Sequence, residues 1–379
     1  MNLNEKIIKK DKYGPEYIIE VYDPKIGMEG FLVIDNTVFG PGKGGIRMTP
    51  GVTAEEVYRL ARTMTWKNSL AGIPFGGAKA GIVWKGGDDH LKKQFVQSFA
   101  KAIRPFLMKK YIAGPDVNTG EKEMQWFVEA VGNLRAATGK PSKICHPSGE
   151  KCGLPHELGS TGFGVAQAAV IAIKLKGLDI KKTTVAIEGF GNVGEFTFKH
   201  LHSAGAKIVA VTDSHGGIYD KNGLDEKTLL HLKHQKKSPV EYPGGTKIKP
   251  SRIFGLPMDV LITAAVTDSI NDKNKNEIRA KIIVEGSNIP MRETIEEELF
   301  RKGILVVPDF VANAGGVISS YAEYRGYSHE KMFRLVERKI KNATTTVLKQ
   351  SLKEKRNPRE VAMEIAVKKV EEKSAENKF

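Results

Sequence analysis

The sequence lacks the features of an exported or membrane-embedded chain. It has no N-terminal apolar stretch with a basic flank, and no uninterrupted apolar run is long enough to cross a bilayer. We therefore expect the protein to stay in the cytoplasm and to have no membrane partner.

Cysteine is also scarce. Only Cys145 and Cys152 occur, and neither the paired spacing nor the histidines of a typical zinc site accompany them. We expect both cysteines to be reduced thiols and the protein to hold no metal. His146 and His156 lie nearby in the sequence, which leaves a metal site as the alternative.

Acidic residues are outnumbered by basic ones, with 59 lysines and arginines against 44 aspartates and glutamates and a net charge of +15. A cationic surface attracts polyanions, which makes nucleic acid an alternative partner. However, the basic residues are scattered through amphipathic segments, with no arginine-rich tail and no aromatic RNA-binding signature. We expect no nucleic-acid partner and a surface that favours small anionic substrates.

The length of 379 residues, 40% of them hydrophobic, predicts two domains. Residues 141–164 are rich in Pro, Gly, Ser and His, which is typical of a connection between domains. We place the first domain at 1–160 and the second at 161–329. The charged, helical segment 330–379 is expected to pack back on the first domain, because so long an amphipathic segment needs a partner face.

Within the first domain, residues 53–71 begin with the capping box formed by Thr53 and Glu56 and continue with apolar residues at helical spacing. A short strand is expected at 81–84. Helices are expected at 89–108 and 121–135, the second with Thr119 as its N-cap.

In the second domain, a helix at 164–176 precedes short apolar strands that alternate with amphipathic helices. The predicted strands are 184–188, 207–212, 259–263, 281–285 and 304–307, and the predicted helices are 193–204, 225–234 and 292–302. Such an alternation is typical of a parallel, doubly wound sheet. The fold class is therefore α/β, with an N-terminal α/β domain followed by a Rossmann-type domain.

The segment Gly189-Phe190-Gly191-Asn192-Val193-Gly194 follows a predicted strand and opens a predicted helix, as the dinucleotide fingerprint requires. Gly189 permits the tight turn, Gly191 lets a pyrophosphate approach the backbone, and Gly194 lets helix and strand pack closely. The alternative is a glycine-rich turn that binds nothing.

Asp213 ends the next predicted strand, where an acidic side chain accepts hydrogen bonds from the ribose hydroxyls of NAD. Ser214 and His215 follow, and a hydroxyl with an imidazole could hold a 2′-phosphate. The cofactor is therefore NAD or NADP. An ordinary turn residue is the alternative for Asp213.

Three lysines of the first domain stand in unusual settings: Lys43 in Gly40-Pro41-Gly42-Lys43-Gly44-Gly45-Ile46-Arg47, Lys67 in Met64-Thr65-Trp66-Lys67-Asn68-Ser69-Leu70, and Lys79 in Pro74-Phe75-Gly76-Gly77-Ala78-Lys79-Ala80-Gly81. Glycine has no side chain, so a small ligand could reach the backbone and the ammonium together. A flexible turn with a solvated charge is the alternative for any one of them.

With these motifs the chain resembles the glutamate, leucine, phenylalanine and valine dehydrogenase family, from about Gly40 to Glu323. Further motifs that carry the resemblance are Ala113-Gly114-Pro115-Asp116-Val117-Asn118-Thr119-Gly120, Leu158-Gly159-Ser160-Thr161-Gly162, Glu285-Gly286-Ser287-Asn288 and Pro308-Asp309-Phe310-Val311-Ala312-Asn313-Ala314-Gly315-Gly316-Val317. The resemblance implies oxidative deamination of glutamate to 2-oxoglutarate and ammonium by a homohexamer.

The resemblance also implies residue roles. Lys79 would activate water, with a lowered pKa, and Asp116 would exchange protons with the substrate nitrogen. Lys67 would bind the α-carboxylate, and Lys43 with Ser320 the far carboxylate. Gly44 and Val317 are expected beside the substrate, and the remaining cofactor contacts are expected at Thr161, Asn192, Val193, Ala265, Asn288 and Asn313.

Relatives that act on leucine, valine or phenylalanine resemble this chain but have an apolar residue in place of Lys43, so a lysine there favours a charged substrate end. Gly42, Ala80 and Asn118 depart from the commonest family pattern and could change the shape of the pocket. A leucine-, valine- or phenylalanine-type dehydrogenase therefore remains the enzymatic alternative. A non-catalytic nucleotide-binding regulator is the other.

Overall fold

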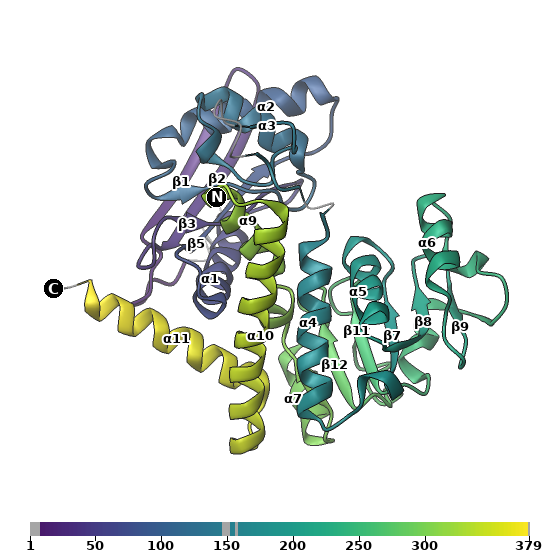
Figure 1. The fold of residues 1–379 in the computed structure, drawn as a ribbon. Coiled ribbons are helices and arrows are strands. Elements are labelled where there is room, and N and C mark those ends of the chain that lie inside the picture. The colour runs from purple at the N-terminus through teal and green to yellow at the C-terminus, as the bar shows by residue number, and fades with distance from the viewer. Residues whose placement is uncertain (1–7, 146–151, 156–157, 378–379) are drawn as a thin grey trace. The chain divides into compact units, whose positions relative to one another are not determined.

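The structure is a computed structural model that describes residues 8–145, 152–155 and 158–377. The chain divides into two compact α/β units (Figure 1). The first contains residues 1–156, 317–332 and 366–379, and the second contains residues 157–316 and 333–365. The predicted fold class is confirmed. In the part of the chain that the structure describes, no helix is long and apolar enough to cross a membrane.

The first unit is built on a six-stranded sheet in the order β1-β2-β5-β3-β6, with β4 paired to β5. Strands β1 and β2 form an antiparallel hairpin that the sequence analysis did not predict, and β3, β4 and β6 run parallel to their neighbours. The strands are β1 (Tyr17–Asp23), β2 (Met28–Asn36), β3 (Gly42–Lys43), β4 (Ile46–Thr49), β5 (Gly76–Val83) and β6 (Tyr111–Ile112).

Helices cover both faces of this sheet. Because successive side chains of a strand point to opposite faces, the side chains of β2 are buried on both sides. Leu32 and Ile34 join a large core that includes residues of α2 and α3. Phe31 and Val33 join a smaller core beneath α1. The helices are α1 (Ala54–Ala71), α2 (Asp89–Ala102), α3 (Glu121–Val131) and α9 (Gly315–Arg325).

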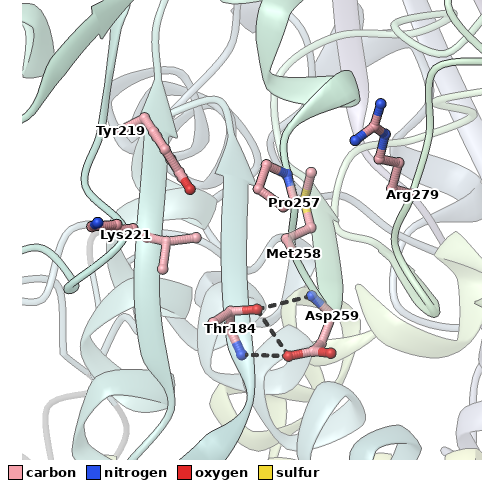
Figure 2. A pocket seen from close by; sticks show the side chains of 8 residues that line it. Thr184, Tyr219, Lys221, Pro257, Met258, Asp259 and Arg279 are labelled. Atoms are coloured by element: carbon pink, nitrogen blue, oxygen red, sulfur yellow. Dashed lines mark hydrogen bonds between the residues drawn. The ribbon is translucent and has the colours of Figure 1, made fainter.

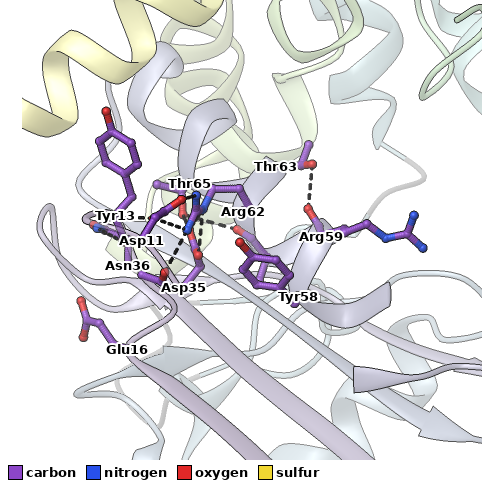
Figure 3. A network of polar contacts seen from close by, with 12 residues as sticks. Asp11, Tyr13, Glu16, Asp35, Asn36, Tyr58, Arg59, Arg62, Thr63 and Thr65 are labelled. Carbon is purple, nitrogen blue, oxygen red and sulfur yellow. Dashed lines mark hydrogen bonds and ion pairs between the residues drawn. The ribbon is translucent and has the colours of Figure 1, made fainter. Parts of the chain in front are cut away.

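A network around Arg62 fixes α1 against the sheet (Figure 3). The Nε of Arg62 donates to both carboxylate oxygens of Asp35, which is fully buried near the end of β2. The rest of the guanidinium pairs with Asp11. The Thr65 hydroxyl also donates to Asp35. Burial raises the pKa of Asp35, although Thr65 and Arg62 partly offset that effect. The network sets the position of the helix that carries Lys67.

The second unit contains a seven-stranded sheet in the order β10-β9-β8-β7-β11-β12-β13. The five strands from β8 to β13 along this order are parallel, as predicted, whereas β9 and β10 add an antiparallel edge that was not predicted. The strands are β7 (Thr184–Glu188), β8 (Lys207–Thr212), β9 (Gly217–Tyr219), β10 (Thr246–Ile248), β11 (Val260–Thr263), β12 (Ile282–Glu285) and β13 (Leu305–Val307).

The helices of the second unit include α4, which starts at Ser160 and therefore earlier than predicted, and α5, which opens directly after the Gly189 turn (Figure 1). Glycine lets these two helices approach closely, since a Cβ on Gly162 would lie 2.5 Å from the carbonyl oxygen of Val193. The helices are α4 (Ser160–Leu175), α5 (Asn192–Ser203), α6 (Glu226–His234), α7 (Glu293–Arg301) and α8 (Asp309–Ala312).

The C-terminal segment forms two long helices, α10 (His329–Glu354) and α11 (Pro358–Glu376). All of residues 330–379 were expected to pack on the first domain, whereas residues 333–365 group with the second unit. The side chains explain the difference: Phe333 packs edge-on against Phe163 of α4, and Ile340 contacts the same helix at Gly164. Residues 366–379 group with the first unit, as predicted for them.

Two local predictions are wrong. Cys145 and Cys152 are not reduced thiols but form a disulfide, because an antiparallel backbone bridge between the two residues brings their sulfur atoms together. His146 and His156 lie outside the described residues. Thr119 is not the N-cap of α3; Gly120 is, and its backbone N–H donates to the Glu123 carboxylate.

Candidate active site

The carboxylate of Asp116 is the centre of a charged cluster in the first unit. Its Oδ1 lies 3.0 Å from the Nζ of Lys79 on β5, and its Oδ2 accepts a hydrogen bond of 3.0 Å from the Nε of Arg47 on β4. Burial alone would raise the pKa of Asp116, but the charges of Lys79 and Arg47 outweigh that effect and hold the pKa below its usual range. The two residues assigned to catalysis, Lys79 and Asp116, are therefore in direct contact.

Lys43 is buried in the same unit, with only 3% of its surface exposed. Its Nζ donates to the carbonyl oxygen of Ala113 at 2.7 Å. Burial lowers the pKa of Lys43 to about 7; the Glu323 carboxylate raises it, and the charges of Lys140 and Lys79 lower it further. The ammonium groups of Lys43 and Lys79 therefore lie close enough for their charges to interact.

A second buried ion pair anchors the helix that carries Ser320. Glu323 on α9 pairs with Lys140 and also accepts hydrogen bonds from the backbone N–H groups of Gly139 and Leu154. Ser320 stands one helical turn before Glu323, so both lie on the same side of α9. Since the charge of Glu323 acts on Lys43, this side of α9 belongs to the neighbourhood of the predicted far-carboxylate site.

The glycines beside the lysines serve a different purpose from the predicted one. A Cβ on Gly44 would overlap the carbonyl oxygen of Ala78, and one on Gly45 would overlap that of Pro115. On Gly114, a Cβ would overlap the Nζ of Lys43. Protein atoms fill the space beside these glycines, which let the backbone segments approach closely enough to bury the lysine.

Lys67 lies near the C-terminal end of α1, which is hydrogen-bonded to the strand that carries Lys79. The amide of the neighbouring Asn68 is buried and donates to the carbonyl oxygen of Gly76, the first residue of β5, at 2.7 Å. Lys67 itself is half-buried. Gly44 is buried and Val317 is half-buried, and both lie in the first unit with the other residues predicted to bind substrate.

The predicted cofactor residues of the second unit gather at one edge of its sheet. Parallel strands end at the same edge, where open α/β sheets bind their ligands. The Gly189 turn follows β7, Asp213 and Ser214 follow β8, Ala265 follows β11, and Asn288 follows β12. Thr161 lies on α4, which packs on α5, and the amide of Asn313 donates to the Oδ1 of Asn288 at 2.9 Å.

The fingerprint turn has the predicted local geometry. Gly189 has φ of +92°, which favours glycine, and a Cβ on Gly194 would overlap the carbonyl oxygen of Gly189. By contrast, a Cβ on Gly191 would meet no atom within 4 Å. Gly191 therefore presents open backbone in front of the N-terminus of α5, where Asn192 and Val193 begin the helix.

Two further observations fit a dinucleotide at this edge. The hydroxyl of Ser287 and the buried hydroxyl of Thr263 have no hydrogen-bond partner among the described residues. Both follow or end strands of the parallel sheet, and a bound ligand could supply the missing partners. The residues present therefore fit a dinucleotide.

One carboxylate oxygen of Asp213 already accepts hydrogen bonds from neighbouring residues. Its Oδ1 accepts hydrogen bonds from the backbone N–H groups of His215 and Gly216 and from the hydroxyl of Ser238. The turn-residue alternative thus applies to Oδ1, whereas Oδ2 lies 3.8 Å from the Nδ1 of His215.

Arg359 of α11 supports the loops that carry Asn288 and Asn313. Its guanidinium pairs with three carboxylates, those of Glu285, Glu296 and Asp309. Burial raises the pKa of Glu285 well above its usual range, and the negative charge of Glu296 raises it further. Asp309 in turn accepts from the backbone N–H of Ile289, next to Asn288, at 3.0 Å.

A shallow pocket of about 430 Å³ lies at the opposite edge of the same sheet (Figure 2). Thr184 begins β7 and Asp259 immediately precedes β11, so the pocket is at the amino ends of the parallel strands. Asp259 accepts hydrogen bonds from the backbone and hydroxyl of Thr184, as Figure 2 shows, and pairs with Lys281. This pocket is distinct from the predicted cofactor edge.

The sequence patterns gave no role in the site to four charged residues of the first-unit clusters: Arg47, Glu56, Lys140 and Glu323. Arg47 stands two residues after Gly45 in a motif that was quoted only for its lysine, and Lys140 immediately precedes the segment 141–164 that was interpreted as a connection. Their partners are distant in sequence, so no spacing revealed them.

Comparisons with known proteins agree with this architecture. Residues 153–377 match the model of the glutamate/leucine/phenylalanine/valine dehydrogenase family, and residues 15–133 match the dimerisation domain of that family. The glutamate dehydrogenase of Aeropyrum pernix is 38% identical over 359 residues, which cover 88% of this chain and 83% of the relative. The NADP-specific glutamate dehydrogenase of Saccharolobus shibatae is 36% identical over 380 residues, which cover 94% and 88%.

Among solved structures, the glutamate dehydrogenase of Peptoniphilus asaccharolyticus superposes with a TM-score of 0.81 at 27% identity, over 96% of this chain and 92% of that chain. The two α/β units and the fingerprint turn define a nicotinamide-dependent amino-acid dehydrogenase. The chain belongs to the glutamate/leucine/phenylalanine/valine dehydrogenase family. Its dimerisation domain indicates that copies of the chain associate.

The pKa of Lys43 leads to a prediction for Lys43→Met. The group titrates near pH 7 in the folded protein and near 10.5 when unfolded, so the unfolded chain binds more protons between these values. The loss of folding stability caused by burying the Lys43 ammonium is therefore complete below pH 7 and declines as the pH rises. In denaturant unfolding, the stability gained by Lys43→Met should be larger at about pH 6 than at about pH 9, by roughly 2–3 kcal/mol. A gain that is equal at both pH values would contradict the assignment.

The open face of Gly191 leads to a second prediction. Gly191→Ala should leave the thermal midpoint unchanged, because its Cβ meets no protein atom within 4 Å. The same substitution should weaken NAD or NADP binding about tenfold or more, since the methyl group occupies the approach to the backbone. Gly51→Ala in the first unit, also open, is the matched control and should change neither quantity. Unweakened cofactor binding in Gly191→Ala would count against the site.

Proposed function

We propose that the protein catalyses the reversible oxidative deamination of L-glutamate to 2-oxoglutarate and ammonium with NAD or NADP. The observation that carries this proposal is the buried ammonium of Lys43. A buried cation is costly unless an opposite charge compensates it, and an aliphatic or aromatic substrate end cannot do so. The second carboxylate of a five-carbon dicarboxylic amino acid can compensate the buried cation.

The residues of the first unit suit a dicarboxylic amino acid. Lys67 binds the α-carboxylate, and Lys43 with the hydroxyl of Ser320 binds the far carboxylate. Gly44 and Val317 lie beside the substrate. The buried pair Lys140–Glu323 supports this assignment, because it neutralises itself and leaves the charge of Lys43 for the ligand.

The contact between Lys79 and Asp116 suits the proton transfers. The substrate loses a hydride from its α-carbon, which the nicotinamide accepts when the cofactor is bound. Lys79 then activates a water molecule that attacks the resulting imine. Asp116 exchanges protons with the substrate nitrogen, so that ammonia leaves as the ketone forms. Since Lys79 and Asp116 are 3.0 Å apart, a proton can pass between them.

The cofactor residues of the second unit have separate roles in this proposal. The Gly189–Gly194 turn with Asn192 and Val193 holds the pyrophosphate, Asp213 and Ser214 hold the ribose or its 2′-phosphate, and Ala265 lines the site. Thr161, Asn288 and Asn313 hold the nicotinamide end. The hydrogen bond between Asn313 and Asn288 supports their joint assignment.

We also propose that the copies form a homohexamer in the cytoplasm. The match to the dimerisation domain supports self-association. The glutamate dehydrogenase of Thermus thermophilus, a structural neighbour at 26% identity with a TM-score of 0.81, is described as hetero-hexameric.

The proposal predicts the outcome of a substrate panel. With glutamate, leucine, valine, phenylalanine and alanine, and with NAD and NADP separately, only glutamate should give rapid formation of reduced cofactor. Lys43→Leu should reduce kcat/KM for glutamate by about a hundredfold, because the loss of a charged hydrogen bond costs about 1.5–3 kcal/mol. Absorbance of the reduced cofactor measures both.

Two results would overturn parts of this proposal. Undiminished glutamate turnover in Lys43→Leu would favour the leucine-, valine- or phenylalanine-type alternative. Cofactor binding with no reduction by any amino acid would instead favour a nucleotide-binding regulator.

A further inference from the structure

Arg47 makes contacts that the proposed roles do not explain. Its Nε donates to Oδ2 of Asp116 at 3.0 Å, and its Nη1 pairs with the carboxylate of Glu56 in the first turn of α1. Its side chain is 17% exposed. One planar guanidinium therefore bridges two carboxylates, a geometry that the single ammonium of lysine reproduces poorly.

The backbone around Asp116 is held without any help from the side chain of Arg47. The N–H groups of Ile46 and Met48 on β4 donate to the carbonyl oxygens of Gly114 and Val117. The hydroxyl of Thr119 accepts from the N–H of Asp116 at 2.9 Å and donates to the carbonyl oxygen of Ile46. Arg47 therefore acts on the carboxylate of Asp116 and not on the path of the chain.

Both oxygens of Asp116 are bound by cations, one by Lys79 and one by Arg47. Tyr111 of β6 also interacts with Asp116, and its hydroxyl donates a hydrogen bond to the carbonyl oxygen of Gly44. During turnover Lys79 must release its proton, and its charge then no longer favours the anion of Asp116. Arg47 keeps its charge throughout, because a guanidinium does not deprotonate in proteins.

We propose that Arg47 is a positioning residue for the reaction: anchored by Glu56, it holds the Asp116 carboxylate in place and anionic while Lys79 changes protonation. This inference rests on the proposed function, since it gives Asp116 the role of proton acceptor. It assigns Arg47 no contact with the substrate or the cofactor.

The inference has a consequence for pH dependence. The charge of Arg47 contributes to the lowered pKa of Asp116, so removing that charge raises the pKa of this carboxyl group. With the raised pKa, Asp116 becomes protonated at the acidic end of the pH range in which activity is measured. Activity should then fall about tenfold for each pH unit below the raised value.

The test compares Arg47→Gln and Arg47→Lys with the wild type, using whichever amino acid the wild type oxidises. Arg47→Gln keeps a hydrogen-bond donor and loses the charge. Its kcat/KM, relative to that of the wild type, should fall by a further factor of about ten between about pH 8 and about pH 5. In Arg47→Lys the charge is retained, so this ratio should change little with pH. Circular dichroism and thermal midpoints at both pH values show whether each variant is folded.

The matched control is Arg59→Met, which removes an exposed arginine from α1 and should leave the pH profile unchanged. A deficit in Arg47→Gln that is the same at both pH values would overturn the inference, because that is what a merely structural role produces. An equal pH dependence in Arg47→Lys would also overturn it. If the wild type oxidises an amino acid other than glutamate, the proposed substrate fails while this test still applies.

Discussion

The first unit buries several positively charged side chains close together. Lys43, Lys79 and Arg47 are gathered on adjacent short strands, and Asp116 is the carboxylate that binds two of them. Taking these charges out of water costs several kcal/mol per ion before compensation. Glycines let the strands that carry these residues approach closely. In the proposed function, an anionic substrate supplies further negative charge.

The second unit shows the opposite arrangement, with one cation among several carboxylates. Arg359 is the shared partner of Glu285, Glu296 and Asp309, whose side chains are buried. Two of these acids lie in or next to the loops after β12 and β13, so the cluster fixes the backbone that carries Asn288 and Asn313. In both units, charge pairs join segments that are distant in the sequence, and these segments carry proposed site residues or their neighbours.

Local patterns predicted much of the fold, because caps, apolar alternation and the fingerprint turn are encoded in neighbouring residues. Thr53 caps α1 as expected, and the strands 184–188 and 207–212 have the predicted bounds. The β1–β2 hairpin was missed because β2 is buried on both faces and shows no alternation. Residues 333–365 group with the second unit because Phe333 and Ile340 contact α4, which helical periodicity cannot reveal.

The candidate site was predicted less completely for the same reason. Lys43, Lys79 and Asp116 were found through their motifs, whereas Arg47 and Glu323 act through partners far along the chain. The glycines around the lysines were correctly singled out but wrongly explained, since only the folded chain shows which atoms occupy the space beside them. The disulfide was missed because two cysteines seven positions apart do not by themselves reveal a backbone bridge.

Proton uptake on ligand binding shows whether a carboxylate binds beside Lys43. Calorimetric titration of glutarate at about pH 8, in buffers with different ionisation enthalpies, measures how many protons the complex takes up. The pKa of about 7 makes Lys43 mostly neutral in the free protein at that pH, and a carboxylate beside it restores the ammonium. The account predicts uptake approaching one proton with glutarate, and none with 4-methylpentanoate or with the Lys43→Met variant. Glutarate binding without proton uptake, or equal uptake in Lys43→Met, would contradict it.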